Sequence, residues 1–340
     1  VGASGYDGDS NNIGRVKIFR QDGQALLQLG DAIEGELTGN RYGRVISLSG
    51  DGNIIAIGVP GSSSGGNVSA GNVRIYSWDG QAWTKLGADI GGEADGDNAG
   101  FSVALSSDGL TVVIGAANSD GNAHNAGNAR IFSWDGQNWN QVGGVIEGEE
   151  DDRLGHSVAI SDDGTIVAVG APSSDYLNPK GCVSIYSWTG QAWSQLGSEI
   201  DGEADGDRSG QTISLSGDGT TVAIGAWQNA GNGYRAGHTR IFNWDGSNWN
   251  QLGNDIDGEK ANDDSGHSVS LSGDGARVAI GAPGHDEDLS DVGSTRIYGW
   301  DGTAWGLMGG NISGDAKWDE LGYSVSLSDD GSTVIAGGPV

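Results

Sequence analysis

The chain has 340 residues, of which 64 are glycine and five are proline, and its formal net charge is −29. Glycine without a three-residue period excludes collagen, and the 12 tryptophans favour a packed fold over a disordered acidic chain. So acidic a chain lacks the basic surface that nucleic acids need and would be repelled by anionic membranes. We therefore expect no nucleic-acid partner and no direct membrane insertion, since no apolar run approaches the roughly 20 residues of a spanning helix. The single cysteine, Cys182, excludes an internal disulfide framework.

Two sequence blocks alternate along the whole chain. The first block, YGRVISLSGDGNIIAIGVPG from Tyr42, recurs about every 56 residues and ends the chain as LGYSVSLSDDGSTVIAGGPV. The second block, GNVRIYSWDGQAWTKLG at 71–87, lies between copies of the first, and a degenerate copy occupies residues 14–30. Each block places alternating or β-branched runs on both sides of an Asp-Gly pair, which is the pattern of a β-hairpin with a tight turn.

Two hairpins in each period give four strands, and no segment shows helical periodicity. The sequence therefore predicts an all-β fold, a six-bladed β-propeller of four-stranded blades that forms a single domain over 1–340. Because the chain begins in a second block and ends in a first block, we expect residues 1–30 and 321–340 to share one composite blade. A piece cut from a longer array of repeats would show the same phase, and a linear solenoid is the alternative fold.

The first block resembles the FG-GAP repeat, most clearly at Leu154-Gly-His-Ser-Val and at Val169-Gly-Ala-Pro172. This repeat builds the propeller of integrin α-chain N-terminal domains and related extracellular proteins, so the resemblance implies a propeller fold, an extracellular location and an adhesive role. The sequence departs from the family in one respect. Where the integrin-type repeat has a calcium loop, this chain has only short turns such as Ser-Asp-Asp-Gly at 161–164.

Each connection from one repeat to the next carries an acidic residue after a glycine. Six of them recur, and five basic residues recur on the predicted third strands as candidate partners: Glu36, Glu93, Glu149, Glu203, Glu259 and Asp315; Lys17, Arg74, Arg130, Arg240 and Arg296. We interpret the acids as acceptors for backbone amides or as partners of a neighbouring blade, and the alternative is a ring that attracts cations.

Alternating carboxylates in two of these connections suggest a candidate Ca²⁺ site. The candidate ligands are Asp201, Glu203, Asp205 and Asp207, with a partial repeat at Glu93, Asp95 and Asp97. Oxygen ligands at every second position, with glycine at the sixth, are typical of a calcium loop. Thr212 stands where such a loop has its bidentate Glu, so a solvated acidic loop is the competing interpretation.

The loops between second and third strands differ from repeat to repeat and carry the candidate ligand-binding residues. These are Tyr6, Tyr176, Trp227, Tyr234 and Arg235. Aromatic side chains at loop tips can stack on a sugar or a protein ligand, although isolated exposed aromatics are also common. His156 and His267 stand at a variable position after the first-block glycine, and no two histidines have metal-ligand spacing. We therefore expect no catalytic constellation.

These observations predict an extracellular or cell-surface module that is not an enzyme. It would serve adhesion or structural interaction and present an acidic loop face to an extracellular protein or glycan, as part of a larger assembly. The alternative function is a calcium-assisted, lectin-like carbohydrate-binding propeller. A polysaccharide hydrolase or lyase is the third.

Overall fold

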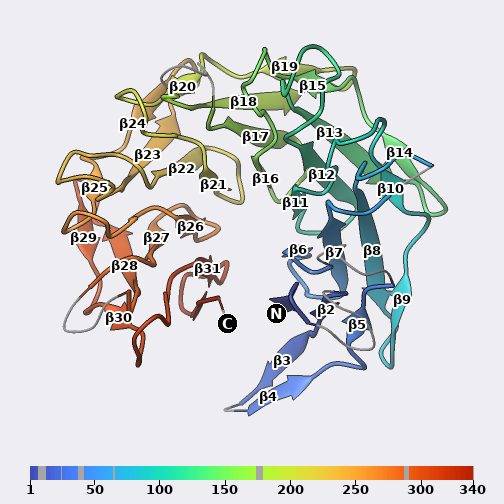
Figure 1. Cartoon of the computed structure of the whole chain (residues 1–340), viewed down its shortest axis with the longest axis horizontal. Helices are drawn as coiled ribbons and strands as arrows, with labels where there is room; N and C mark the ends of the chain where they lie inside the picture. Colours follow the sequence, from blue (N-terminus) through green and yellow to red (C-terminus); the bar gives the residue numbers. More distant parts are fainter. Residues whose placement is uncertain are drawn as a thin grey trace. The chain divides into compact units, whose positions relative to one another are not determined.

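The computed structural model describes residues 1–6, 13–23, 25–36, 42–63, 66–173, 179–286 and 291–339. Within these ranges every regular element is a β-strand, and no helix is long and apolar enough to cross a membrane. The chain divides into two compact units, residues 1–155 (unit 1) and 156–340 (unit 2). Figure 1 shows the strands of each unit gathered into small antiparallel sheets, as the all-β prediction requires.

The described part of unit 1 contains fifteen strands. They are β1 (Gly2–Ala3), β2 (Arg15–Val16), β3 (Phe19–Asp22), β4 (Ala25–Gln28), β5 (Ile33–Glu34), β6 (Val45–Leu48), β7 (Ile54–Val59), β8 (Asn72–Trp78), β9 (Trp83–Lys85), β10 (Ile90–Gly91), β11 (Ser102–Leu105), β12 (Thr111–Ala116), β13 (Asn128–Trp134), β14 (Trp139–Gln141) and β15 (Ile146–Glu147).

Unit 2 contains the other strands of the described part of the chain. They are β16 (Ser157–Ile160), β17 (Ile166–Ala171), β18 (Cys182–Trp188), β19 (Trp193–Gln195), β20 (Ile200–Asp201), β21 (Thr212–Leu215), β22 (Thr221–Ala226), β23 (His238–Trp244), β24 (Trp249–Gln251), β25 (Ile256–Asp257), β26 (Ser268–Leu271), β27 (Arg277–Ala282), β28 (Ser294–Trp300), β29 (Trp305–Leu307), β30 (Ile312–Ser313), β31 (Ser324–Leu327) and β32 (Val334–Gly337).

One sheet plan recurs, and the β11–β15 sheet represents it. Its strand order is β11-β12-β13-β14, and β15 also pairs with β13, so the fourth position is shared by two short strands. The middle strands are the most buried, because their β-branched residues face neighbours on both sides: Val112, Val113 and Ile114 are fully buried. Four strand positions in each of the five larger sheets of the described chain agree with the predicted repeat, and the number of blades stays a prediction.

The first hairpin of each repeat closes with a Ser-x-Asp-Gly turn. In the β11–β12 turn, Asp108 accepts hydrogen bonds from the backbone N–H of Leu110 (2.8 Å) and from the Ser106 hydroxyl (2.6 Å). The Ser106 oxygen in turn accepts the N–H of Thr111, and Gly109 has φ of +70°. The aspartates of these turns therefore support the hairpins, and turn chemistry explains this share of the acidity.

Neighbouring sheets pack through pairs of glycines. Gly115 in β12 lies so close to Gly155 that a Cβ atom on Gly115 would stand 2.0 Å from the Gly155 carbonyl oxygen. The same backbone contact recurs with nearly the same geometry at Gly58 and Gly100, at Gly170 and Gly210, at Gly225 and Gly266, and at Gly281 and Gly322. Both glycines of each repeat are thus required by one close approach of backbone to backbone.

Paired tryptophans join four of the sheets to the segment before them. Trp134 and Trp139 flank the second hairpin turn of their sheet with ring centroids 5.4 Å apart, and Trp139 donates its indole N–H to the carbonyl of Leu86 (2.9 Å). Trp83, Trp249 and Trp305 make equivalent bonds to Leu29, Leu196 and Leu252. The tryptophans therefore serve packing between sheets, in agreement with their regular spacing.

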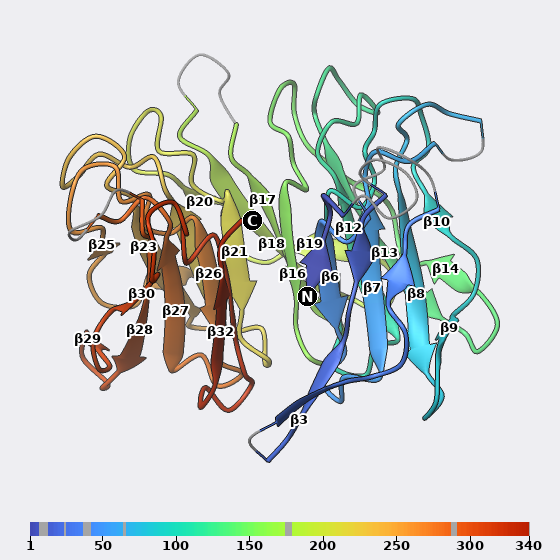
Figure 2. The same ribbon diagram turned by 60° about the horizontal axis from the view of Figure 1, so that its bottom comes forward.

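The terminal segments form smaller sheets. In unit 1, β2 pairs with β1 and β5, while β3 and β4 form a separate hairpin that projects from the unit in Figure 2. In unit 2, β31 and β32 form a hairpin of their own. A partner for β2 so close to the amino terminus was not predicted. The shared blade of residues 1–30 and 321–340, and the single domain over 1–340, stay predictions.

Candidate functional site

Two of the predicted ligand-binding residues meet in the loop between β22 and β23. The Arg235 guanidinium lies over the Trp227 ring, 4.5 Å from its centroid. Asp264 holds the same guanidinium in a fork: Nε of Arg235 donates to one carboxylate oxygen (3.0 Å) and Nη2 donates to the other (2.8 Å). A planar bidentate pair fixes the orientation of Arg235 through its Nε and Nη2 and leaves its Nη1 outside the pair.

Two residues from the starts of later strands complete this cluster. His267, just before β26, lies edge-on to Trp227 with centroids 6.1 Å apart, and Tyr323, just before β31, lies 4.6 Å from the His267 ring. We call Trp227, Arg235, Asp264, His267 and Tyr323 the aromatic–histidine cluster. The sequence analysis set His267 aside because its position varies between repeats. Only the fold shows that this position faces the β22–β23 loop.

The His267 imidazole has one defined tautomer. Its Nδ1 lies 3.2 Å from the backbone carbonyl oxygen of Tyr323, and because a carbonyl can only accept, Nδ1 carries the proton. Burial lowers the pKa of His267 below its ordinary value, and the Arg235 charge acts in the same direction while the Tyr323 bond opposes it. The imidazole is therefore neutral at pH 7, with Nε2 able to accept a proton.

The other predicted ligand residues do not join this cluster. Tyr234 is 72% exposed. In unit 1, Tyr6 stacks under Arg15, whose guanidinium carbon lies 3.8 Å from the ring centroid. Tyr176 lies outside the described residues.

The predicted calcium ligands are divided among different tasks. Asp97 accepts the backbone N–H groups of Glu93 (2.9 Å) and Ala94 (2.8 Å), and Asp207 accepts that of Ala204 (2.9 Å). Asp95 accepts the N–H of Val68 (2.7 Å). Asp97 and Asp207 are both only 3% exposed, so they order the crossover backbone. Asp201 and Asp205 lie in the same crossover as Asp207, and binding of Ca²⁺ to these residues stays a prediction.

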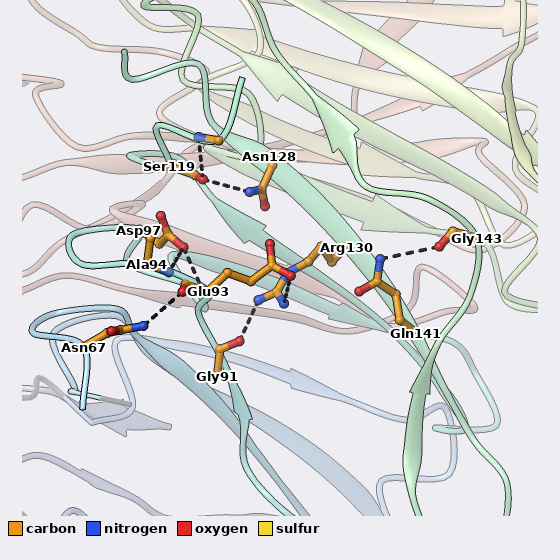
Figure 3. Close-up of polar contacts among 11 residues, drawn as sticks. Asn67, Gly91, Glu93, Ala94, Asp97, Ser119, Asn128, Arg130, Gln141 and Gly143 are labelled. Carbon is orange, nitrogen blue, oxygen red and sulfur yellow. Dashed lines mark hydrogen bonds and ion pairs between the residues drawn. The ribbon is translucent and has the colours of Figure 1, made fainter. Parts of the chain in front are cut away.

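Glutamates of the crossovers pair with arginines of the next sheet. Figure 3 shows the pair in unit 1: Nη2 of Arg130 donates to the Gly91 carbonyl (2.7 Å), and Nη1 lies 3.5 Å from Oε1 of Glu93. In unit 2, Nη1 of Arg240 lies 3.7 Å from Oε1 of Glu203. Equivalent pairs join Arg74 to Glu36 and Arg296 to Glu259. The interpretation of these acids as partners of a neighbouring sheet is confirmed at these four positions.

Shallow cavities follow the same junctions. One, of about 340 Å³, is lined by Asp255, Asp257, Tyr298 and Trp305, among others. Two equivalent cavities, of about 270 and 240 Å³, are lined by Arg130 and Trp139 and by Arg240 and Trp249. Burial raises the pKa of Asp257, the more so because of Asp255, while the neighbouring His238 opposes this shift.

Two histidines lie next to carboxylates at these junctions, and the spacing of residues in the sequence did not predict this. His238 faces Glu203 and Asp255, and His285 faces Glu259 and Asp263; in each group the candidate ligand atoms lie within 4.8 Å of one another. His238 and His285 are each 1% exposed. The only sequence signal for His238 was a histidine at a position where other repeats have Asn72, Asn128, Cys182 or Ser294, and His285 likewise stands where other repeats have Ser62, Ser119 or Asn229.

No family profile matches this sequence, and no curated protein matches it. Among solved structures, it is similar to a periplasmic gluconolactonase of Pseudomonas aeruginosa, with 14% identity, a TM-score of 0.62, and coverage of 94% of this chain and 84% of that one. It is also similar to a putative 6-phosphogluconolactonase of Bacteroides uniformis (12% identity, TM-score 0.61, coverage 95% and 84%) and to one of Bacteroides fragilis (13%, 0.62, 98% and 86%). At such identities the likeness establishes the fold, which is propeller-like.

These neighbours correct part of the sequence analysis. All three are named as lactonases and none as an adhesion protein. The prediction of a non-enzymatic adhesion or structural-interaction module is therefore wrong, and so is the prediction that the chain is not an enzyme. The FG-GAP resemblance is neither confirmed nor excluded by these structures.

Proposed function

We propose that the chain hydrolyses a sugar lactone, with His267 as the general base. The observation that carries the proposal is the neutral imidazole of His267, held by the Tyr323 carbonyl and adjoining an aromatic ring and a guanidinium. Enzymes place bases with such pKa values where proton transfer is needed near neutral pH. The lactonase names of the structural neighbours support the same reaction class.

The chemistry follows from the cluster. His267 Nε2 accepts a proton from a water molecule whose oxygen adds to the carbonyl carbon of the lactone. The carbonyl oxygen becomes an oxyanion and accepts a hydrogen bond from Nη1 of Arg235, which Asp264 keeps in place. The ring C–O bond then breaks, and the proton on His267 passes to the departing oxygen, giving an open-chain hydroxy acid. The rings of Trp227 and Tyr323 supply the stacking surface that a sugar ring needs.

An uncharged lactone fits better than a phosphorylated one. The only arginine of the cluster is already neutralised by Asp264, and the net charge of −29 repels a phosphate dianion. A location outside the cytoplasm, as in the name of the Pseudomonas neighbour, is part of the proposal.

The test compares glucono-1,5-lactone with its 6-phosphate in a pH-stat assay near neutral pH, with the spontaneous rate subtracted. We expect hydrolysis of the uncharged lactone, and His267→Gln should lower kcat about 10²–10⁴-fold, the usual contribution of a general base. The pKa of His267 lies below its ordinary value, so the imidazole stays unprotonated around pH 7. We therefore expect kcat/KM to be independent of pH near neutrality and to fall only at more acidic pH.

His156→Gln is the matched control. His156 occupies the equivalent position in another repeat, where its Nε2 lies 3.3 Å from Nε2 of Gln211. The control variant should keep the activity of the unmodified protein. Activity no higher than the spontaneous rate, or a His267→Gln variant as active as the His156→Gln variant, would overturn the proposal.

A further inference from the structure

The imidazole of His238 makes no hydrogen bond within the described part of the chain. It is the first residue of β23, its side chain is 1% exposed, and its Nε2 is buried without a partner. Its Nδ1 points between two carboxylates, 4.0 Å from Oε2 of Glu203 and 3.8 Å from Oδ2 of Asp255. Both separations are too long for a hydrogen bond. A buried polar ring is thus held near two acids without bonding to either.

The two carboxylates leave one oxygen each for a shared ligand. Oε1 of Glu203 faces Nη1 of Arg240 (3.7 Å), and Oδ1 of Asp255 accepts a hydrogen bond from Gln251 (2.6 Å). The remaining oxygens, Oε2 and Oδ2, are those that face His238, and the three atoms lie within 4.8 Å of one another. This spacing fits three ligands arranged around one cation at bonds of about 2.0–2.2 Å, with small side-chain adjustments.

The other repeats show what the same junction does without the histidine. In unit 1, Asn128 takes the place of His238 and donates to the Ser119 hydroxyl (2.9 Å; Figure 3). In the repeat pattern of the sequence, Val145 takes the place of Asp255. The Glu93–Arg130 pair forms there all the same, so the ion pair between sheets needs neither a histidine nor a second acid.

The second group of this kind is drawn closer together. Nδ1 of His285 lies 3.3 Å from Oδ1 of Asp263, whose other oxygen accepts the N–H groups of Glu259 (3.0 Å) and Lys260 (2.9 Å). Asp263 is therefore held by the crossover turn and lies next to His285, whereas both carboxylates near His238 are farther from its imidazole and are not used by a turn in this way. The His238 group is the stronger candidate.

We propose that Glu203, His238 and Asp255 bind a first-row divalent cation of the Zn²⁺ type. One imidazole nitrogen and two carboxylate oxygens form a donor set that zinc accepts, and the remaining coordination position is open to water or to a ligand. Ca²⁺ prefers sets made only of oxygen, so this site differs in chemistry and residues from the calcium loop expected from the sequence. Glu203 and Asp255 are 45% and 28% exposed, which gives the ion a path to the buried nitrogen. The site stands independently of the proposed lactonase activity.

The experiment measures metal binding by the whole chain. The protein is stripped with chelator and dialysed against Zn²⁺ in the presence of excess Ca²⁺ and physiological salt, which suppress loose binding to the acidic surface. We expect one equivalent of Zn²⁺ to be retained. Co²⁺ in place of Zn²⁺ should give the visible absorption of a low-coordinate site with a nitrogen ligand.

Three variants and one matched control decide the outcome. His238→Asn, Glu203→Gln and Asp255→Asn should each lose the bound equivalent and the Co²⁺ absorption, and the last two change partly exposed residues, so they test the site even if His238→Asn fails to fold. Glu93→Gln, the same change at the junction without a histidine, should retain both. Retention of the metal by Glu203→Gln and Asp255→Asn, equal loss in Glu93→Gln, or displacement of Zn²⁺ by Ca²⁺ would overturn the proposal.

Discussion

Replacing Gly115 by alanine tests the glycine contact between neighbouring sheets. Gly115 lies inside β12 and does not have a positive φ, so alanine brings no backbone strain of its own. The new methyl group, however, would lie 2.0 Å from the carbonyl oxygen of Gly155 and 2.3 Å from the Ser102 hydroxyl. That hydroxyl donates to the same carbonyl (2.7 Å), so the two backbone segments must move apart and this hydrogen bond must lengthen.

The expected cost is about 3 kcal/mol. Overpacking alone costs about 1–3 kcal/mol, and loss of a hydrogen bond adds about 1 kcal/mol. Urea unfolding followed by tryptophan fluorescence measures the change. Gly144→Ala is the control, because a methyl group there meets no atom within 4 Å, and its effect should stay within about 0.5 kcal/mol. Equal free energies of unfolding for the two variants would refute the reasoning.

Three further perturbations follow from the described contacts. Trp139→Phe keeps an aromatic ring but loses the indole hydrogen bond to Leu86, so it should lower the free energy of unfolding by about 1–2 kcal/mol. Trp134→Phe is the control and should lower it by less. A larger loss in Trp134→Phe than in Trp139→Phe would contradict the role given to the indole bond. Hydrogen bonds, first from a neighbouring serine hydroxyl, lower the pKa of Asp330 to about 2, so its stabilisation is present above the unfolded pKa of about 3.9 and is lost as the pH falls towards 2. Asp330→Asn should therefore flatten the acid side of the stability–pH curve, and an unchanged slope would rule this out. Asp207→Ala should cost about 1–2 kcal/mol equally with chelator and with Ca²⁺, because its acceptor role is structural; a cost seen only with Ca²⁺ would assign the residue to a metal site instead.

Local patterns in the sequence predicted most of the fold. Alternation and Asp-Gly pairs act over a few residues, and the structure forms hairpins where they predict them, as in the turn at Asp108. The ion-pair partners of the crossover acids could also be predicted from the sequence, because residues equivalent to Glu93 and Arg130 recur at fixed places in successive repeats. Repetition turns a distant contact into a periodic one, and periodicity is visible in a single sequence.

The candidate site could not be predicted in this way, because its contacts do not repeat along the chain. His267 and Tyr323 stand at a position that varies between repeats, where others have Arg44, Phe101 or Gln211, and His267 meets Trp227 only because loops from different sheets converge. Nothing periodic marks such a contact. His238 is a comparable case, since its carboxylate neighbours lie 35 residues before it and 17 after it in the chain. Trp227 and Arg235, two of the five predicted ligand-binding residues, contact each other because both belong to one loop, and their role in binding stays a prediction.

The contact between glycines has a consequence for how the chain can change. Gly115 meets Gly155 through a carbonyl and a bare Cα, and the same geometry returns at Gly225 and Gly266. Since the only side chain described in this contact is a recurring hydroxyl, Ser102 or Thr212, the fit does not depend on which residues the loops display. Whole repeats could thus be duplicated, exchanged or given new loops by recombination without redesign of the surfaces that meet. Proteins that evolve in this way can vary the binding residues in their loops while the glycine contacts between their repeats stay the same.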